Sequence, residues 1–170
     1  MTDPKARVVV CDAGPLIHLD EVDSLDLLAD FAEVIVTDAV WEEVEKHRPG
    51  ALAQSNGVFR RARPQKDVPV VLEALTQVFS LHAGELEALR VALEYPGGIL
   101  LSDDTAARMA AKNLGIETHG TIGILIRAIR REQRTKGEIL LVLESLPERS
   151  SLYLKRSLLD QVIRELEGNI

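Results

Sequence analysis

Short apolar runs that alternate with helical segments constrain the fold of this chain more than any other feature. The runs cover residues 8–11, 34–36 and 99–101, and each is followed by apolar residues at helical spacing. Runs of this length fit buried strands better than helices. Strands that alternate with helices form a parallel sheet wrapped by helices. The sequence therefore predicts an α/β fold with a central parallel sheet.

The other expected elements follow from spacing and end signals. Residues 116–119 are a weaker edge-strand candidate, and the basic segment between Pro49-Gly50 and Lys66 stays unassigned. Asp67 is the expected cap of the helix that carries Pro69 in its first turn. Gly115 is expected to end a helix in a left-handed conformation. Helices are expected near residues 13–19, 25–31, 38–47, 67–78, 84–93, 106–114, 122–131, 138–146 and 157–166.

Bulk composition is that of one ordinary globular domain. The chain has 170 residues, of which 46% are hydrophobic and 28% charged, so it can bury a substantial core. The single cysteine, Cys11, excludes an internal disulfide framework. No run approaches the roughly 18 apolar residues of a membrane span, and we expect a cytoplasmic protein without membrane contact.

Acidic residues stand where the predicted elements end or begin. Asp12 closes the first apolar run, and Asp103-Asp104 closes the run at 99–101. Because ligand crevices in open α/β sheets lie outside the carboxyl ends of the strands, these acids are expected to meet. Glu43 shares a helix side with Val40 and Val44, and Glu85 follows a glycine at a helix start.

Converging carboxylates favour a divalent cation. Each close pair repels by roughly 4 kcal/mol at an effective dielectric constant near 20, which should raise the carboxyl pKa values in the absence of metal. A site that offers only oxygen ligands suits Mg²⁺ or Mn²⁺. The leading interpretation is therefore a metal-dependent hydrolase. Helix capping by Asp12 or Asp104, and the helix dipole for Glu85, are the purely structural alternatives.

Other chemistries have less support. The chain lacks a Gly-x-Gly-x-x-Gly or Gly-Lys-Ser/Thr phosphate loop, and Gly14 stands where an aspartyl phosphatase would need a second acid. Cys11 has no evident base nearby in the sequence, which disfavours a thiol nucleophile. The histidines lack metal-ligand spacing; they are His18, His47, His82 and His119.

A net charge of −7 argues against a protein that coats nucleic acid, although local basic clusters can still bind phosphates. One cluster lies at residues 60–66. The other follows the helix predicted at 122–132 and its continuation, with i, i+3, i+4 and i+7 spacing, and consists of Arg127, Arg130, Arg131 and Arg134. We predict that this stripe binds RNA; the alternative is a solvated face with Glu132 as its internal partner.

Five motifs in order resemble the PIN-domain family, in particular the prokaryotic branch that contains the VapC toxins. They are Asp-Ala-Gly-Pro-Leu-Ile at 12–17, Val-x-x-Glu-Val at 40–44, Gly-Glu-x-Glu-Ala at 84–88, Leu-x-Asp-Asp-x-x-Ala-Arg at 101–108 and Gly-Thr-x-Gly-x-Leu at 120–125. The resemblance covers about residues 7–130. We expect one PIN-like domain over residues 1–170, with C-terminal helices at 138–167.

The resemblance implies a three-layer α/β/α fold, a Mg²⁺ or Mn²⁺ site and endoribonuclease activity on single-stranded RNA. Asp12, Glu43, Glu85 and Asp104 match the four acids of the family, with Asp103 as a neighbour. Asp12 and Asp104 would be direct metal ligands, while Glu43 and Glu85 would hold metal-bound waters or a second ion.

Two departures keep a second interpretation open. Ala13 stands where family members often have Ser or Thr, and Glu85 stands where they often have Asp. The alternative is therefore a catalytically inactive PIN-like module that binds RNA or protein. The resemblance also implies a toxin with a small antitoxin partner, and a homodimer. The leucine-rich last two helices favour a C2 dimer, with packing on the sheet as the alternative use of their apolar surface.

Overall fold

The predicted parallel sheet is present. A computed structural model describes residues 7–55 and 57–168, so the ends of the predicted 1–170 domain lie outside the described residues. The sheet has five strands, all parallel, in the order β3-β2-β1-β4-β5. The strands are β1 (Val8–Cys11), β2 (Glu33–Thr37), β3 (Phe59–Ala62), β4 (Ile99–Leu101) and β5 (Glu117–His119).

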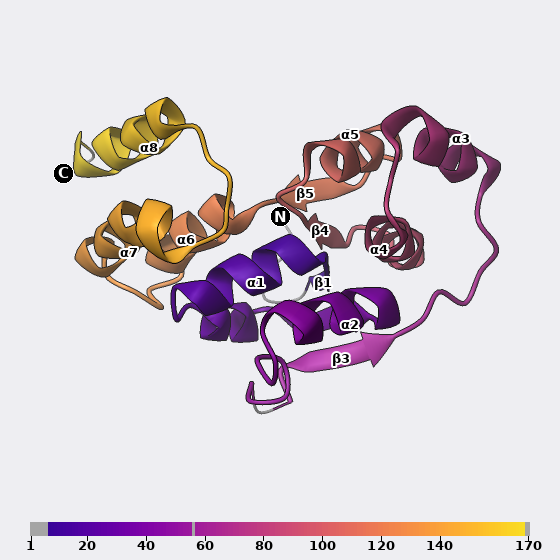
Figure 1. The fold of residues 1–170 in the computed structure, drawn as a ribbon, viewed down its shortest axis with the longest axis horizontal. Coiled ribbons are helices and arrows are strands. Elements are labelled where there is room, and N and C mark those ends of the chain that lie inside the picture. Colours follow the sequence, from indigo (N-terminus) through magenta and orange to yellow (C-terminus); the bar gives the residue numbers. More distant parts are fainter. Residues whose placement is uncertain (1–6, 56, 169–170) are drawn as a thin grey trace.

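Helices flank the sheet on both sides (Figure 1). The chain moves outward from β1 to β2 in one direction and from β4 to β5 in the other, so right-handed crossovers place α1 and α5 on opposite faces. The helical elements are α1 (Ala13–Glu21), η2 (Leu25–Asp30), α2 (Asp38–His47), α3 (Val70–Phe79), α4 (Ala83–Leu93), α5 (Thr105–Asn113), α6 (Thr121–Arg130), α7 (Lys136–Arg149) and α8 (Arg156–Gly168).

Strand β3 lies in the segment that sequence reasoning left unassigned. It pairs with β2 at the edge of the sheet, from Val34 opposite Phe59 to Thr37 opposite Ala62. Its two middle residues, Arg60 and Arg61, are exposed. An edge strand of this kind needs no apolar run, and its sequence therefore lacks the signal that marks the buried strands.

Several element ends differ from the prediction. The segment after Ser24 is a 3-10 helix rather than an α-helix, and α3 is capped by Pro69 rather than by Asp67. Helix α6 ends at Arg130, and Glu132 has a φ of 57°, so the predicted continuation of this helix toward Arg134 is wrong. Gly115 has the expected left-handed conformation, with a φ of 72°.

The C-terminal helices extend the molecule away from the sheet. Helix α7 packs on α6, and α8 packs on α7 (Figure 1). Most of their apolar side chains are covered within the chain, with Ile139, Leu143 and Leu159 fully buried. Residues 150–155 connect the two helices and are called the α7–α8 linker below. Within the part of the chain that the structure describes, no helix is long and apolar enough to span a membrane.

Candidate active site

A pocket opens at the carboxyl ends of β1 and β4, where the predicted acids meet. Its volume is about 510 Å³. The lining includes four of the predicted acids together with Asp103, two histidines and residues from the α7–α8 linker. The acids are Asp12, Glu43, Glu85, Asp103 and Asp104. The topology thus brings together acids that are up to 92 positions apart in the chain.

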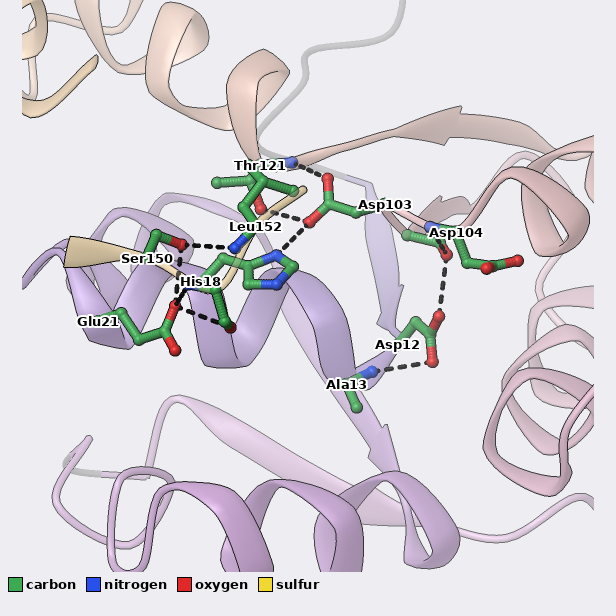
Figure 2. Close-up of polar contacts among 11 residues, drawn as sticks. Asp12, Ala13, His18, Glu21, Asp103, Asp104, Thr121, Ser150 and Leu152 are labelled. Atoms are coloured by element: carbon green, nitrogen blue, oxygen red, sulfur yellow. Dashed lines mark hydrogen bonds and ion pairs between the residues drawn. The ribbon is translucent and has the colours of Figure 1, made fainter. Parts of the chain in front are cut away.

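Asp12 is the most deeply placed acid. It follows β1, caps α1 and is only 6% exposed. One carboxylate oxygen accepts a hydrogen bond from the Ala13 amide at 2.8 Å, and the other accepts one from the Ser102 hydroxyl at 2.9 Å (Figure 2). The pKa of Asp12 is raised to about 6: burial is the largest cause, the charges of Glu85 and Glu43 add smaller contributions, and the two hydrogen bonds act in the opposite direction. Mutual repulsion, which we expected to dominate, is therefore the smaller cause.

Ser102 links Asp12 to Asp104. This serine is fully buried after β4, and its hydroxyl oxygen accepts a hydrogen bond from the Asp104 amide at 3.2 Å while it donates to Asp12. Asp104 is also the N-cap of α5, because its side chain accepts from the Ala107 amide at 2.8 Å. The expected capping role is therefore present, and it occupies one of the two carboxylate oxygens.

Glu43 and Glu85 reach the pocket from the opposite side. Glu85 is the third residue of α4 and accepts a hydrogen bond from the His82 amide at 2.8 Å, which closes the first turn of the helix. Burial raises its pKa, and the charges of Asp104 and Glu43 add to the shift. Glu43 is exposed on α2, and its carboxylate would lie 3.3 Å from a Cβ atom placed on Gly84. The absence of a side chain at Gly84 thus lets Glu43 approach α4.

Asp103 points away from Asp12, toward α6 and α1 (Figure 2). One of its oxygens accepts from the Thr121 amide at 2.8 Å, and the other accepts from the Thr121 hydroxyl at 2.6 Å and contacts the His18 Nδ1 atom at 2.8 Å. Burial alone would raise its pKa, but the hydrogen bonds outweigh burial and hold the pKa below its ordinary value. Asp103 therefore ties three elements together, whereas we predicted it as a metal ligand.

The donor set suits a divalent cation in its chemistry. The acids offer only oxygen atoms, and Asp12 is a buried carboxylate whose charge is poorly compensated. However, among residues 7–55 and 57–168 no three His, Cys, Asp or Glu side chains already converge in an arrangement that could hold a metal ion. Ligation would therefore require the neighbouring acids to turn toward Asp12.

The predicted arginine stripe lies outside the acid pocket, beside the edge strand β5. Arg127 and Arg131 line a separate pocket with Arg7, which precedes β1, and with Glu117 at the start of β5. Both arginines contact one carboxylate oxygen of Asp30 at 2.8 Å. Their internal partner is thus an acid of η2 rather than Glu132, because helix α6 ends before that residue.

Arg134 and Arg130 complete the stripe. Arg134 lies beyond α6 and pairs with Asp26 at 2.7 Å, again through an acid of η2. Arg130 is exposed at the rim of the same pocket as Arg127. None of the four arginines lines the acid pocket.

Sequence reasoning missed the residues that hold the acids in place. Ser102, Thr121 and His18 act through hydrogen bonds between distant segments. Thr121 belongs to the Gly-Thr-x-Gly-x-Leu motif, which was the one available signal. No sequence pattern predicted that the α7–α8 linker lines the pocket, because its position depends on how α7 and α8 pack in the tertiary structure.

Comparison with known proteins is consistent with this geometry. A family model described as a PIN domain matches residues 8–168, which is nearly the whole chain. No match was found among curated proteins. PIN domains are generally nucleases and typically use divalent metal ions, which agrees with a pocket of carboxylates.

Proposed function

Because this chain belongs to the PIN-domain family, we propose that it is a Mg²⁺- or Mn²⁺-dependent endoribonuclease that hydrolyses phosphodiester bonds of single-stranded RNA. The observation that carries the proposal is the environment of Asp12. This carboxylate is buried at the end of the central strand, has a raised pKa of about 6, and faces a pocket that Glu43, Glu85 and Asp104 also line. A buried, charged Asp12 destabilises the fold, and groups with such perturbed pKa values are concentrated at functional sites.

In this proposal Asp12 and Asp104 hold the ion, and Glu43 and Glu85 face it across the pocket. A bound divalent ion supplies activation of water and neutralisation of charge on the phosphate. Ser102 orients Asp12 by donating its hydroxyl proton and orients Asp104 by accepting from its amide. Ser102 also places a hydroxyl beside the first acid, although residue 13 is alanine. The carboxylates of Glu43 and Glu85 can accept hydrogen bonds from water in the pocket and so orient it.

The direct test compares cleavage of a single-stranded RNA in Mn²⁺ by the wild type, by Asp12→Asn and by Asp160→Asn. Asp160 is a matched control because it lies on α8 and pairs with Arg156, outside the acid pocket. We expect Asp12→Asn to lose at least 100-fold in rate, while Asp160→Asn stays at the wild-type level. Equal cleavage by all three proteins would reveal a contaminating nuclease and refute the proposal.

A second candidate is a PIN-like module that binds RNA or protein without cutting. It is favoured by the lack, within the described ranges, of three acids already in metal-binding geometry. Titration calorimetry with Mn²⁺ at pH 7.5 separates the two candidates. Uptake that Asp12→Asn abolishes supports the enzyme, whereas RNA binding without metal uptake supports the module.

We further propose a toxin role, with a small antitoxin protein as partner and a homodimer as the assembly. These proposals rest on the resemblance of the five motifs to the VapC branch. Growth arrest on expression of the wild type, and normal growth with Asp12→Asn, would support the toxin role. Light scattering at several concentrations would test the dimer, since a constant mass of 18.7 kDa identifies a monomer.

A further inference from the structure

We propose that Tyr153 forms a nucleobase-binding subsite at the mouth of the acid pocket, where its ring stacks on an unpaired base of the RNA. This inference rests on the proposed ribonuclease function and identifies an unpaired base as the part of the substrate that Tyr153 binds. Tyr153 lies in the α7–α8 linker and lines the acid pocket together with Ser151 and Leu152. The linker comes from the C-terminal part of the chain, beyond the five sequence motifs.

The linker is fastened to α1, so Tyr153 has a defined place at the pocket. A single carboxylate oxygen of Glu21 accepts from the Ser150 hydroxyl at 2.8 Å (Figure 2). The same oxygen accepts from the Ser151 amide at 2.7 Å and the Ser151 hydroxyl at 3.1 Å. The Leu152 amide donates to the Ser150 hydroxyl oxygen at 3.1 Å, which closes a turn just before Tyr153. Partial burial would raise the pKa of Glu21, but these donors outweigh burial and hold it below its ordinary value.

The ring of Tyr153 is left uncovered by the fold. It is 88% exposed, whereas the neighbouring Leu152 is half-buried. Among the described residues no other aromatic side chain belongs to the exposed large hydrophobic residues. Because Tyr153 adds almost nothing to the core, its removal should leave the stability of the protein unchanged. An exposed aromatic ring beside a functional pocket is available for contact with a ligand.

The chemistry of the pocket favours a base rather than a phosphate as the ligand of this rim. Within the described part of the chain, none of the lining residues is lysine or arginine, and five are acids. The side chains of the pocket therefore repel the RNA backbone. Stacking on an aromatic ring does not depend on charge, and every base offers a π-face. A base held by Tyr153 would bring its strand to the acids despite that repulsion.

The subsite also gives a physical reason for single-strand selectivity. Bases in a duplex are already stacked on their neighbours, so they cannot offer a free face to Tyr153. Unpaired bases can, and stacking tolerates any base identity. The proposal therefore predicts a preference for unpaired RNA with weak dependence on sequence.

The test measures binding of a fluorescent single-stranded RNA in the Asp12→Asn background, so that no cleavage interferes. In this background we compare Tyr153→Ala, Tyr153→Phe and Leu141→Ala. Leu141 is a matched control, because it is 68% exposed on α7 and does not line the acid pocket. Relative to the Asp12→Asn parent, we expect roughly 5- to 100-fold weaker binding for Tyr153→Ala, nearly unchanged binding for Tyr153→Phe and no change for Leu141→Ala. Melting temperatures should be equal for all variants.

Each outcome decides the proposal separately from the ribonuclease assignment. If Tyr153→Ala binds as tightly as its parent, or Tyr153→Phe is as weak as Tyr153→Ala, the stacking subsite is refuted even when the wild type cleaves RNA. If the parent binds no single-stranded RNA, the subsite is refuted as well. If only Tyr153→Ala weakens binding while the wild type cleaves nothing, the subsite stands and the nuclease proposal fails.

Discussion

At the scale of single residues, burial sets the properties of the site more than repulsion between acids does. Asp12 has its pKa raised first by burial and only then by Glu85 and Glu43. Glu43 is exposed on α2, where water screens its charge, whereas Asp12 is enclosed at the end of β1. A charge that is costly in the metal-free fold gains the most when a cation arrives.

Asp12→Asn should stabilise the metal-free protein in a pH-dependent way. Asp12 has a folded pKa of about 6 against an ordinary value of 3.8, so the folded state binds more protons than the unfolded chain between these values. Stability is therefore lost as pH rises through this window. We expect Asn to add roughly 1–3 kcal/mol at pH 7.5 with EDTA and almost nothing at pH 3.5. Thermal unfolding of both proteins at the two pH values measures this difference. An equal change in melting temperature at pH 7.5 and pH 3.5 would contradict the prediction.

Gly84→Ala should impair activity more than stability. The added methyl group would lie 3.3 Å from the Glu43 carboxylate, so the flexible end of that side chain must move by a few tenths of an ångström. Alanine is also the better residue within a helix, by roughly 1 kcal/mol. We expect an unchanged or higher melting temperature with a several-fold lower cleavage rate in Mn²⁺. An unchanged rate would show that the position of Glu43 does not matter for catalysis.

At the scale of elements, the site depends on ties between segments that are distant in sequence. Asp103 joins the end of β4 to the first turn of α6 and to α1, through Thr121 and His18. Glu21 joins α1 to the α7–α8 linker. Hydrogen-bond donors hold both carboxylates in their charged form, and each carboxylate therefore stabilises the fold.

Asp103→Ala should destabilise the fold in the absence of metal. It removes the acceptor of three hydrogen-bond contacts and leaves the buried Thr121 amide without its partner. We expect a loss of roughly 2–4 kcal/mol in the free energy of unfolding, measured by urea denaturation at pH 7.5 with EDTA. If Asp103 acted as a metal ligand instead, metal-free stability would be nearly unchanged and Mn²⁺ affinity would fall.

At the scale of the whole molecule, the acids and the arginine stripe line two separate pockets. The acid pocket lies at the carboxyl ends of β1 and β4, and the arginine pocket lies between α6 and β5, with both Glu117 and His119 of that strand in its lining. Arg127 also stacks over Phe31, with its guanidinium carbon 4.0 Å from the ring centroid. This arrangement gives Arg127 a structural role whether or not RNA binds nearby.

Arg127→Ala and Arg130→Ala should therefore behave differently. Arg127→Ala loses both the Asp30 contact and the Phe31 stacking, and we expect a cost of roughly 1–3 kcal/mol in stability. Arg130 is exposed, so its replacement should leave stability unchanged. If the predicted arginines bind RNA, Arg130→Ala should reduce the slope of log affinity against log salt by about 1. Binding with an unchanged slope would remove Arg130 from the RNA-binding surface.

The central fold and the placement of the acids could be read from the sequence for a physical reason. Buried strands need apolar runs, and the ligand crevice of a parallel sheet lies at the carboxyl ends of its strands. Asp12 and Asp104, which follow two such runs, were therefore expected to lie in the same crevice. Edge strand β3 could not be predicted, because its two middle residues are exposed arginines and the strand therefore lacks the apolar run that marks a buried strand.

The sequence by itself determined the parallel α/β sheet and the meeting of Asp12 with Asp103-Asp104, because both follow from periodicity and strand polarity, whereas Glu43 and Glu85 were assigned to the same site by the family resemblance. Only the tertiary structure decided what each acid does there. Ser102 contacts Asp12 across 90 residues, Asp103 turns to Thr121, and the α7–α8 linker brings Tyr153 to the pocket. Such contacts depend on packing between distant segments, which no local pattern encodes.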